Sequence, residues 1–208
     1  MKIGVLLAGA GMYDGTDVHE AVLTLLALER AGAKPLCLAP ARRQLHTVSH
    51  LTGDEVPGES RLAHEEAARL ARGKIQTLEG FWPGALQGLV VPGGSGVPKT
   101  LMTGFLELGR ARELLPEVRG LIGDLAGRSR PLGAIGLGRT LLRAYFGEEL
   151  DEAELALPAG RIEVDRERRT VFTPGFLTSD RAAEVAEGID AMVSELLSMA
   201  SAGLPPTR

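Results

Sequence analysis

Short apolar runs alternate with amphipathic segments along most of the chain. The runs have the length of strands, and Gly, Pro or charged residues bound them. They cover residues 2–8, 34–39, 89–92, 131–135 and 170–173. Strands that alternate with helical segments are typical of an α/β fold, so the pattern predicts a mostly parallel, doubly wound sheet sandwiched by helices.

The segments between the runs carry the 3.6-residue period of amphipathic helices. The first has Val18, Ala21, Val22, Leu25 and Leu28 on one face and closes with Ala31-Gly32. A second is predicted over residues 59–72 and a third over 137–145. The last begins at Ser179 or Asp180, either of which can cap it, and runs through Leu196.

Length and charge narrow the class of protein. A chain of 208 residues is long enough for one sizeable core, so we expect one domain over residues 1–208. The net charge of −4 and the lack of a basic stripe argue against nucleic acid as a partner. No apolar run approaches the ~18 residues of a membrane span, and a strand begins at once. With a single cysteine, Cys37, we expect a cytoplasmic protein without an internal disulfide.

The segment PLGAIGLGR at residues 131–139 predicts a buried strand that turns sharply into a helix. In α/β enzymes such an elbow strains its central residue by roughly 1–3 kcal/mol and presents the side chain of that residue at the carboxyl end of the sheet. Here the central residue is Gly136, which has no side chain. The loops at residues 9–15 and 93–96 also follow strands, and ligands bind at this edge of open α/β sheets.

Several segments carry a family resemblance. They include MYDGTDVHEA at residues 12–21, HLTG at 50–53, VPGG at 91–94, Lys99 and PLG at 131–133. Together they resemble the ElbB family, also called sigma cross-reacting protein, of the ThiJ/PfpI superfamily. The resemblance runs nearly end to end. It implies a flavodoxin-like fold like that of class I glutamine amidotransferases, often dimeric, and a glyoxalase activity that converts glyoxals into hydroxy acids without a cofactor.

The same resemblance implies a site. The family cysteine falls on Gly136, the family glutamate on Glu20, and the oxyanion-hole amides on Gly94 and Leu137. A thiolate must attack the aldehyde to form a hemithioacetal, whereas Glu20 alone can act only as a base. We therefore expect a non-covalent binding or regulatory protein with a vestigial glyoxalase pocket. The alternatives are a weak glyoxalase-like enzyme acting through Glu20, and a structural partner in a homodimer with an apolar face such as Phe81-Trp82.

Each candidate residue also has a structural explanation. Glu20 stands at capping-box spacing from Asp17, where it would bond the backbone of the cap. The glycines at 94 and 136 either form turns or expose amides that attract anions. Arg139 would add positive charge to the pocket and favour a carboxylate or phosphate guest. Asp14 either lines the same cleft or forms a turn with Gly15.

From these observations we expect the ligand to be a small carbonyl or anionic metabolite, and we expect no cofactor. His46 and His50 have the spacing of metal ligands on a helix. Pro40 and the β-branched Thr47 and Val48 argue against a helix there. We therefore predict no metal site.

Overall fold

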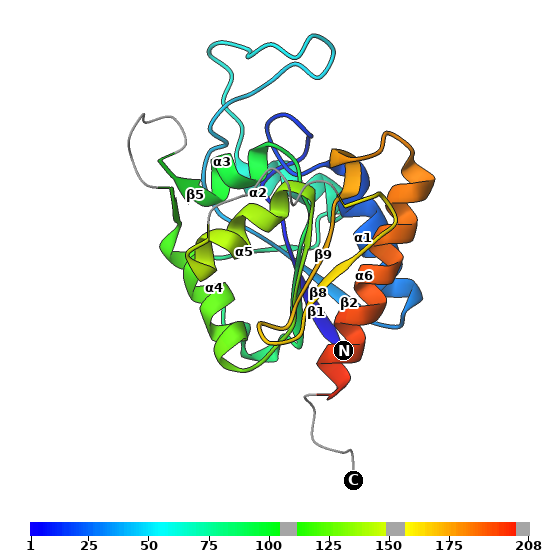
Figure 1. The fold of residues 1–208 in the computed structure, drawn as a ribbon. Coiled ribbons are helices and arrows are strands. Elements are labelled where there is room, and N and C mark those ends of the chain that lie inside the picture. The colour runs from blue at the N-terminus through cyan, green and yellow to red at the C-terminus, as the bar shows by residue number, and fades with distance from the viewer. Residues whose placement is uncertain (105–111, 149–156, 203–208) are drawn as a thin grey trace.

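The structure is a computed structural model, and it describes residues 1–104, 112–148 and 157–202. Its main sheet has seven strands in the order β3-β2-β1-β4-β7-β9-β8 (Figure 1). They are β1 (Lys2–Leu6), β2 (Lys34–Ala39), β3 (Ile75–Thr77), β4 (Gly88–Val91), β7 (Leu132–Ile135), β8 (Glu163–Asp165) and β9 (Thr170–Thr173). Every neighbouring pair is parallel except β8 and β9. The predicted flavodoxin-like α/β sheet is confirmed.

Helices cover both faces of this sheet. On one face lie α1 (Val18–Arg30), α2 (Ala63–Leu70) and α6 (Ala182–Ala202); on the other lie α3 (Gly96–Leu101), α4 (Pro116–Gly127) and α5 (Arg139–Phe146). Alternate strand residues separate the two halves of the core, because side chains along a strand point to opposite faces. Val5 thus packs with the α1 and α6 side, and Leu6 with the α4 and α5 side.

Strand order reverses at β1, which has β2 on one side and β4 on the other. Open α/β sheets bind ligands beyond the carboxyl ends of the strands at such a reversal. The loop after β1 therefore occupies the place where a ligand site is expected. β1 itself ends at Leu6 and not at residue 8, because the Ala8 N–H leaves the ladder and donates to Thr16 Oγ1 at 2.8 Å.

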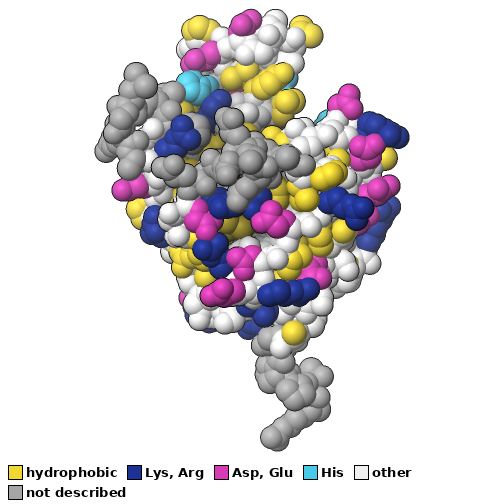
Figure 2. Space-filling view, in the orientation of Figure 1, with side chains coloured by type: hydrophobic (Ala, Val, Ile, Leu, Met, Phe, Trp, Pro, Cys, Tyr) yellow, Lys and Arg dark blue, Asp and Glu magenta, His cyan; other side chains and the backbone are white. Residues whose placement is uncertain are grey.

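Residues 41–62 form an arm that projects beyond the sheet (Figure 1). Isolated antiparallel bridges join Arg43 to Leu62 and Val48 to Glu55. Because Leu62 is extended in this pairing, the second helix begins at Ala63 and not at residue 59. Hydrophobic side chains are visible on the arm in the space-filling view, and Leu51 is 95 % exposed (Figure 2).

Some elements carried too weak a sequence signal to be predicted. They are β3, the polar edge strand β8, and the antiparallel pair β5 (Met102–Thr103) and β6 (Glu113–Leu114). Short helices also occur in the described ranges, among them η1 (Pro83–Ala85), η2 (Gly136–Gly138) and η4 (Gly175–Leu177). The last helix begins at Ala182. Just before it, Ser179 Oγ accepts a hydrogen bond from the Arg181 N–H at 3.0 Å. Among the described residues, no helix is both long and apolar enough to cross a bilayer.

Candidate functional site

Four chain segments meet at the carboxyl end of the sheet. They follow β1, β4, β7 and β9, and the last two contain η2 and η4. Between them lies a pocket of about 90 Å³. Its lining consists of Met12, Asp17, Glu20, Gly94, Ser95, Gly136, Leu137, Phe176 and Leu177. The tertiary structure thus brings together four of the residues expected at a ligand site, namely Glu20, Gly94, Gly136 and Leu137.

Glu20 is the buried charged group of this pocket. The residue is 3 % exposed, and two backbone N–H groups donate to its carboxylate. Gly93 N–H donates to Oε2 at 2.7 Å, and Phe176 N–H donates to Oε1 at 3.0 Å. The carboxyl group is therefore fixed between the segment after β4 and the segment after β9.

Burial raises the pKa of Glu20 from its usual 4.5 to about 7. The hydrogen bond from Phe176 opposes this shift, the nearby Asp17 carboxylate adds to it, and the hydrogen bond from Gly93 again opposes it. Desolvation outweighs the two hydrogen bonds because the charged form is excluded from water. Near neutral pH this group can both give and take a proton, as a general acid or base must.

Only half of the capping box that the spacing of Asp17 and Glu20 allows forms. Asp17 caps α1, since its Oδ1 accepts the Glu20 N–H at 3.0 Å. The Asp17 N–H, which Glu20 would bond in a capping box, instead donates to Gly93 O at 2.8 Å. The Glu20 side chain is thereby available to the pocket.

Gly136 lies at the elbow with φ +51°, in the left-handed region that side chains rarely adopt. A Cβ at this position would lie 3.2 Å from Glu20 Oε1 and 3.5 Å from Oε2. A side chain here would thus touch the carboxylate directly. With glycine, that space belongs to the pocket.

The segment after β9 holds functional residues that the sequence analysis missed. Gly175 has φ +57°, and a Cβ there would lie 2.2 Å from Glu20 Oε1. Only glycine lets this backbone come close enough for Phe176 N–H to reach the carboxylate. The one signal in the sequence was Pro174-Gly175 directly after a predicted strand.

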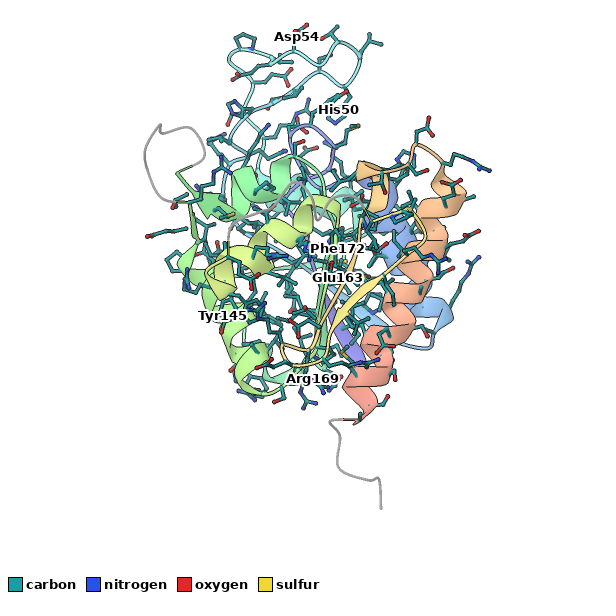
Figure 3. All side chains as sticks on the ribbon, in the orientation of Figure 1. His50, Asp54, Tyr145, Glu163, Arg169 and Phe172 are labelled. Atoms are coloured by element: carbon teal, nitrogen blue, oxygen red, sulfur yellow. The ribbon has the colours of Figure 1, made fainter. Side chains whose placement is uncertain are left out.

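Arg139 does not line this pocket. The prediction that Arg139 adds positive charge to the pocket is therefore wrong. Its guanidinium lies over the Phe172 ring at 4.2 Å and pairs with Glu163 at 2.6 Å. Glu163 and Phe172 are labelled in Figure 3. The physical reason is η2, which separates Arg139 from Gly136 by one turn, so that the arginine begins α5 on the other face of the sheet.

Asp14 is likewise absent from the pocket lining. Its side chain is wholly buried, and Oδ2 accepts the Val48 N–H at 2.8 Å. Gln44 Nε2 also donates to the Asp14 carbonyl. Asp14 therefore joins the loop after β1 to the projecting arm.

The single cysteine, Cys37, and the two histidines considered as metal ligands, His46 and His50, lie outside this pocket. Burial raises the pKa of Cys37, on β2, to about 11, which disfavours a thiolate. His46 Nδ1 lies 3.2 Å from Glu55 Oε1, and His50 lies close to Tyr13 and Asp14. Within the described ranges, no group of three or more His, Cys, Asp or Glu side chains is arranged to hold a metal ion.

Comparisons with known structures support the architecture. The structure of an isoprenoid biosynthesis protein with an amidotransferase-like domain from Ehrlichia chaffeensis superposes with a TM-score of 0.86 at 27 % identity, covering 95 % of this chain and 99 % of that one. A ThiJ/PfpI domain protein from Brachyspira murdochii shares the fold, with a TM-score of 0.54, 13 % identity and coverage of 95 % and 96 %. Fold and elbow together define a protein with an amidotransferase-like fold, which the ThiJ/PfpI domain protein shares.

Sequence comparison narrows this class. No family model matches the chain. The human glutamine amidotransferase-like class 1 domain-containing protein 3, mitochondrial, is 31 % identical over 223 residues, covering 95 % of this chain and 83 % of the relative. The rat ES1 protein homolog, mitochondrial, is 30 % identical over 223 residues, with coverage of 95 % and 84 %. The chain belongs to the family of these two proteins.

Proposed function

We propose that this chain is an ElbB-like protein that binds a small carbonyl compound non-covalently in the Glu20 pocket. The observation that carries the proposal is Gly136, because the elbow presents no nucleophile at this position. The Glu20 carboxylate beside it is nevertheless held in place by two backbone N–H groups. Without a thiol no hemithioacetal forms, and the space that a side chain would fill is left to the ligand.

The charges around the pocket favour a neutral ligand over the anionic one also expected from the sequence. Asp17 and Glu20 both line it, and Arg139, the expected counter-charge, pairs with Glu163 on the other face. A carboxylate guest would therefore meet two carboxyl groups. A neutral carbonyl can accept a hydrogen bond from protonated Glu20, and its hydrate can donate one to the ionised form.

A second candidate function rests on the pKa of Glu20 near 7. A group that exchanges protons at neutral pH could rearrange a bound glyoxal slowly without a thiol. In that reaction one water adds to the aldehyde, hydrogen moves to the neighbouring carbonyl carbon, and a hydroxy acid results, so no external oxidant or reductant is needed. This would be a weak, cofactor-independent glyoxalase-like enzyme.

One experiment separates the two functions. Purified protein is incubated with methylglyoxal, lactate formation is followed, and binding of hydroxyacetone and of pyruvate is measured by NMR titration. We expect the native chain to bind neutral hydroxyacetone more tightly than pyruvate and to form no lactate. Gly136→Cys should gain lactate formation, because the thiol would stand against Glu20.

Variants of two glutamates on α1 complete the design. Glu20→Gln should weaken hydroxyacetone binding, whereas Glu29→Gln, an exposed change on the same helix, should leave it unaltered. If the native chain forms lactate and Glu20→Gln abolishes this, the second function replaces the first. Equal binding by Glu20→Gln and the native chain would contradict the proposed pocket.

A further inference from the structure

His50 and Asp14 meet where the arm contacts the loop after β1. His50 Nε2 is 3.3 Å from the Tyr13 nitrogen, and His50 Nδ1 is 3.2 Å from Val48 O. The Tyr13 N–H can only donate, so Nε2 must carry a lone pair. Nδ1 then carries the hydrogen and donates it to Val48 O. These partners fix the neutral form of His50, which lies on the arm in Figure 3.

The same imidazole faces an unpaired buried carboxylate oxygen. Asp14 Oδ1 has no hydrogen-bond partner in the described part of the chain, and its side chain is wholly buried. It lies 3.9 Å from His50 Nε2. A buried acceptor without a partner is costly, and a charge-assisted hydrogen bond is the strongest way to satisfy it.

We infer that His50 is a positioning residue that holds the Met12 wall of the pocket while neutral and releases it when protonated. A proton on Nε2 removes the lone pair that accepts the Tyr13 N–H. It also places a cationic donor opposite Asp14 Oδ1, and a small movement of the ring then closes that bond. The proton comes from solvent, because the His50 side chain is 39 % exposed.

His50 is connected to the pocket through Tyr13, whose neighbour in the chain is the pocket residue Met12. Met12 lines the pocket, and its carbonyl accepts the Ser95 N–H at 2.7 Å. Tyr13 follows it, and the Tyr13 carbonyl accepts from Lys99 Nζ at 3.3 Å. The bond to His50 is thus an anchor of this loop on the arm side. The inference concerns the pocket without ligand, so its test is independent of the proposed function.

Other titratable groups face this junction, and the test must separate them from His50. The Tyr13 ring lies 5.1 Å from the His50 ring, and Lys99 reaches the same loop from α3. On the arm, His46 pairs with Glu55. In the pocket, Glu20 titrates near pH 7 beside Met12. The experiment therefore uses both the native chain and the full chain carrying Glu20→Gln.

NMR between pH 8 and pH 5.5 reports the Tyr13 amide, the Met12 methyl group and the His50 ring proton. We expect the three signals to titrate with one midpoint in the Glu20→Gln chain, whereas in the native chain the Met12 signal should also report Glu20. Protection of the Tyr13 amide from hydrogen exchange, corrected for the intrinsic rate, should fall roughly three- to tenfold as His50 gains its proton, since a single neutral hydrogen bond is lost.

Three variants decide the outcome. His50→Gln should abolish the titration of Tyr13 and Met12 in the Glu20→Gln chain, and the matched arm variant His46→Gln should preserve it. Asp14→Asn removes the carboxylate oxygen that the protonated ring would bond, so the fall in Tyr13 protection should be smaller in this variant. Persistence of the response in His50→Gln, or an undiminished fall in Asp14→Asn, would overturn the inference.

Discussion

Glu20 couples the stability of the fold to pH because its carboxyl group is buried. In the unfolded chain this group ionises near pH 4.5, and in the folded protein near pH 7. Between these values the folded state binds the additional proton, so stability falls as pH rises. The contribution is fully present below about pH 4.5 and is lost as pH rises through about 7.

The raised pKa of Glu20 predicts that the free energy of unfolding differs between acidic and alkaline pH. The native chain should lose about 2–3 kcal/mol of unfolding free energy between pH 5 and pH 8 through Glu20, at roughly 1.4 kcal/mol per pKa unit. Urea denaturation at both pH values checks this. Glu29→Gln should retain the loss and Glu20→Gln should not, so an equal pH dependence in the two variants would contradict the assigned pKa shift.

The contact between η4 and α1 depends on a single missing side chain. Gly175 on η4 lies against the Glu20 carboxylate of α1, where a Cβ would be only 2.2 Å from Oε1. Gly175→Ala must push the two elements apart and break the bond from Phe176 N–H to Glu20. The change also places alanine in the left-handed region, at φ +57°.

Gly32 provides the matched control for the Gly175→Ala substitution. It has φ +74°, and a Cβ there would meet nothing within 4 Å. Gly32→Ala should therefore cost only the conformational strain of about 1 kcal/mol, whereas Gly175→Ala should cost roughly 1–3 kcal/mol more. Thermal unfolding of the two variants tests this. Equal losses would mean that η4 can move away from Glu20 without penalty.

For the whole molecule, we propose the homodimer expected from the sequence, with α1 at its interface. Val18, Val22 and Leu26 follow one another at four-residue intervals on α1 and are 41 %, 48 % and 39 % exposed. Met12 and Leu177, at the pocket, are exposed apolar residues as well. Contiguous exposed apolar side chains are typical of association surfaces.

Sedimentation velocity tests this surface. The native chain should sediment as a dimer, and Val22→Glu should shift it to the monomer because a buried interface would have to accept an unpaired charge. Leu51→Glu, which alters the exposed leucine of the arm, should leave the dimer intact. A native monomer at all concentrations, or a dimer that survives Val22→Glu, would rule out the α1 interface. The cytoplasmic location also stays a prediction, since both relatives are named mitochondrial.

Local patterns in the sequence were sufficient for the parts of the fold that depend on neighbouring residues. The apolar runs placed β2 at its observed bounds, and the helical period of residues 18–30 placed α1, because strand and helix periodicities are local properties. The elbow with glycine at its centre could be predicted from residues 131–139 alone. The sequence also made Asp17 a helix cap, since a cap needs only the amide three residues on.

Tertiary structure decided whatever depends on partners distant in the chain. The Glu20 carboxylate bonds Gly93 and Phe176, which are 73 and 156 residues away, so periodicity could not reveal its role. Arg139 turned to the opposite face because η2 intervened, and the pairing of the arm delayed the start of α2. Sequence alone thus determined which residue types reach the edge of the sheet. Only the folded chain decided which of them share a pocket, because that depends on how separate loops pack at one end of the strands.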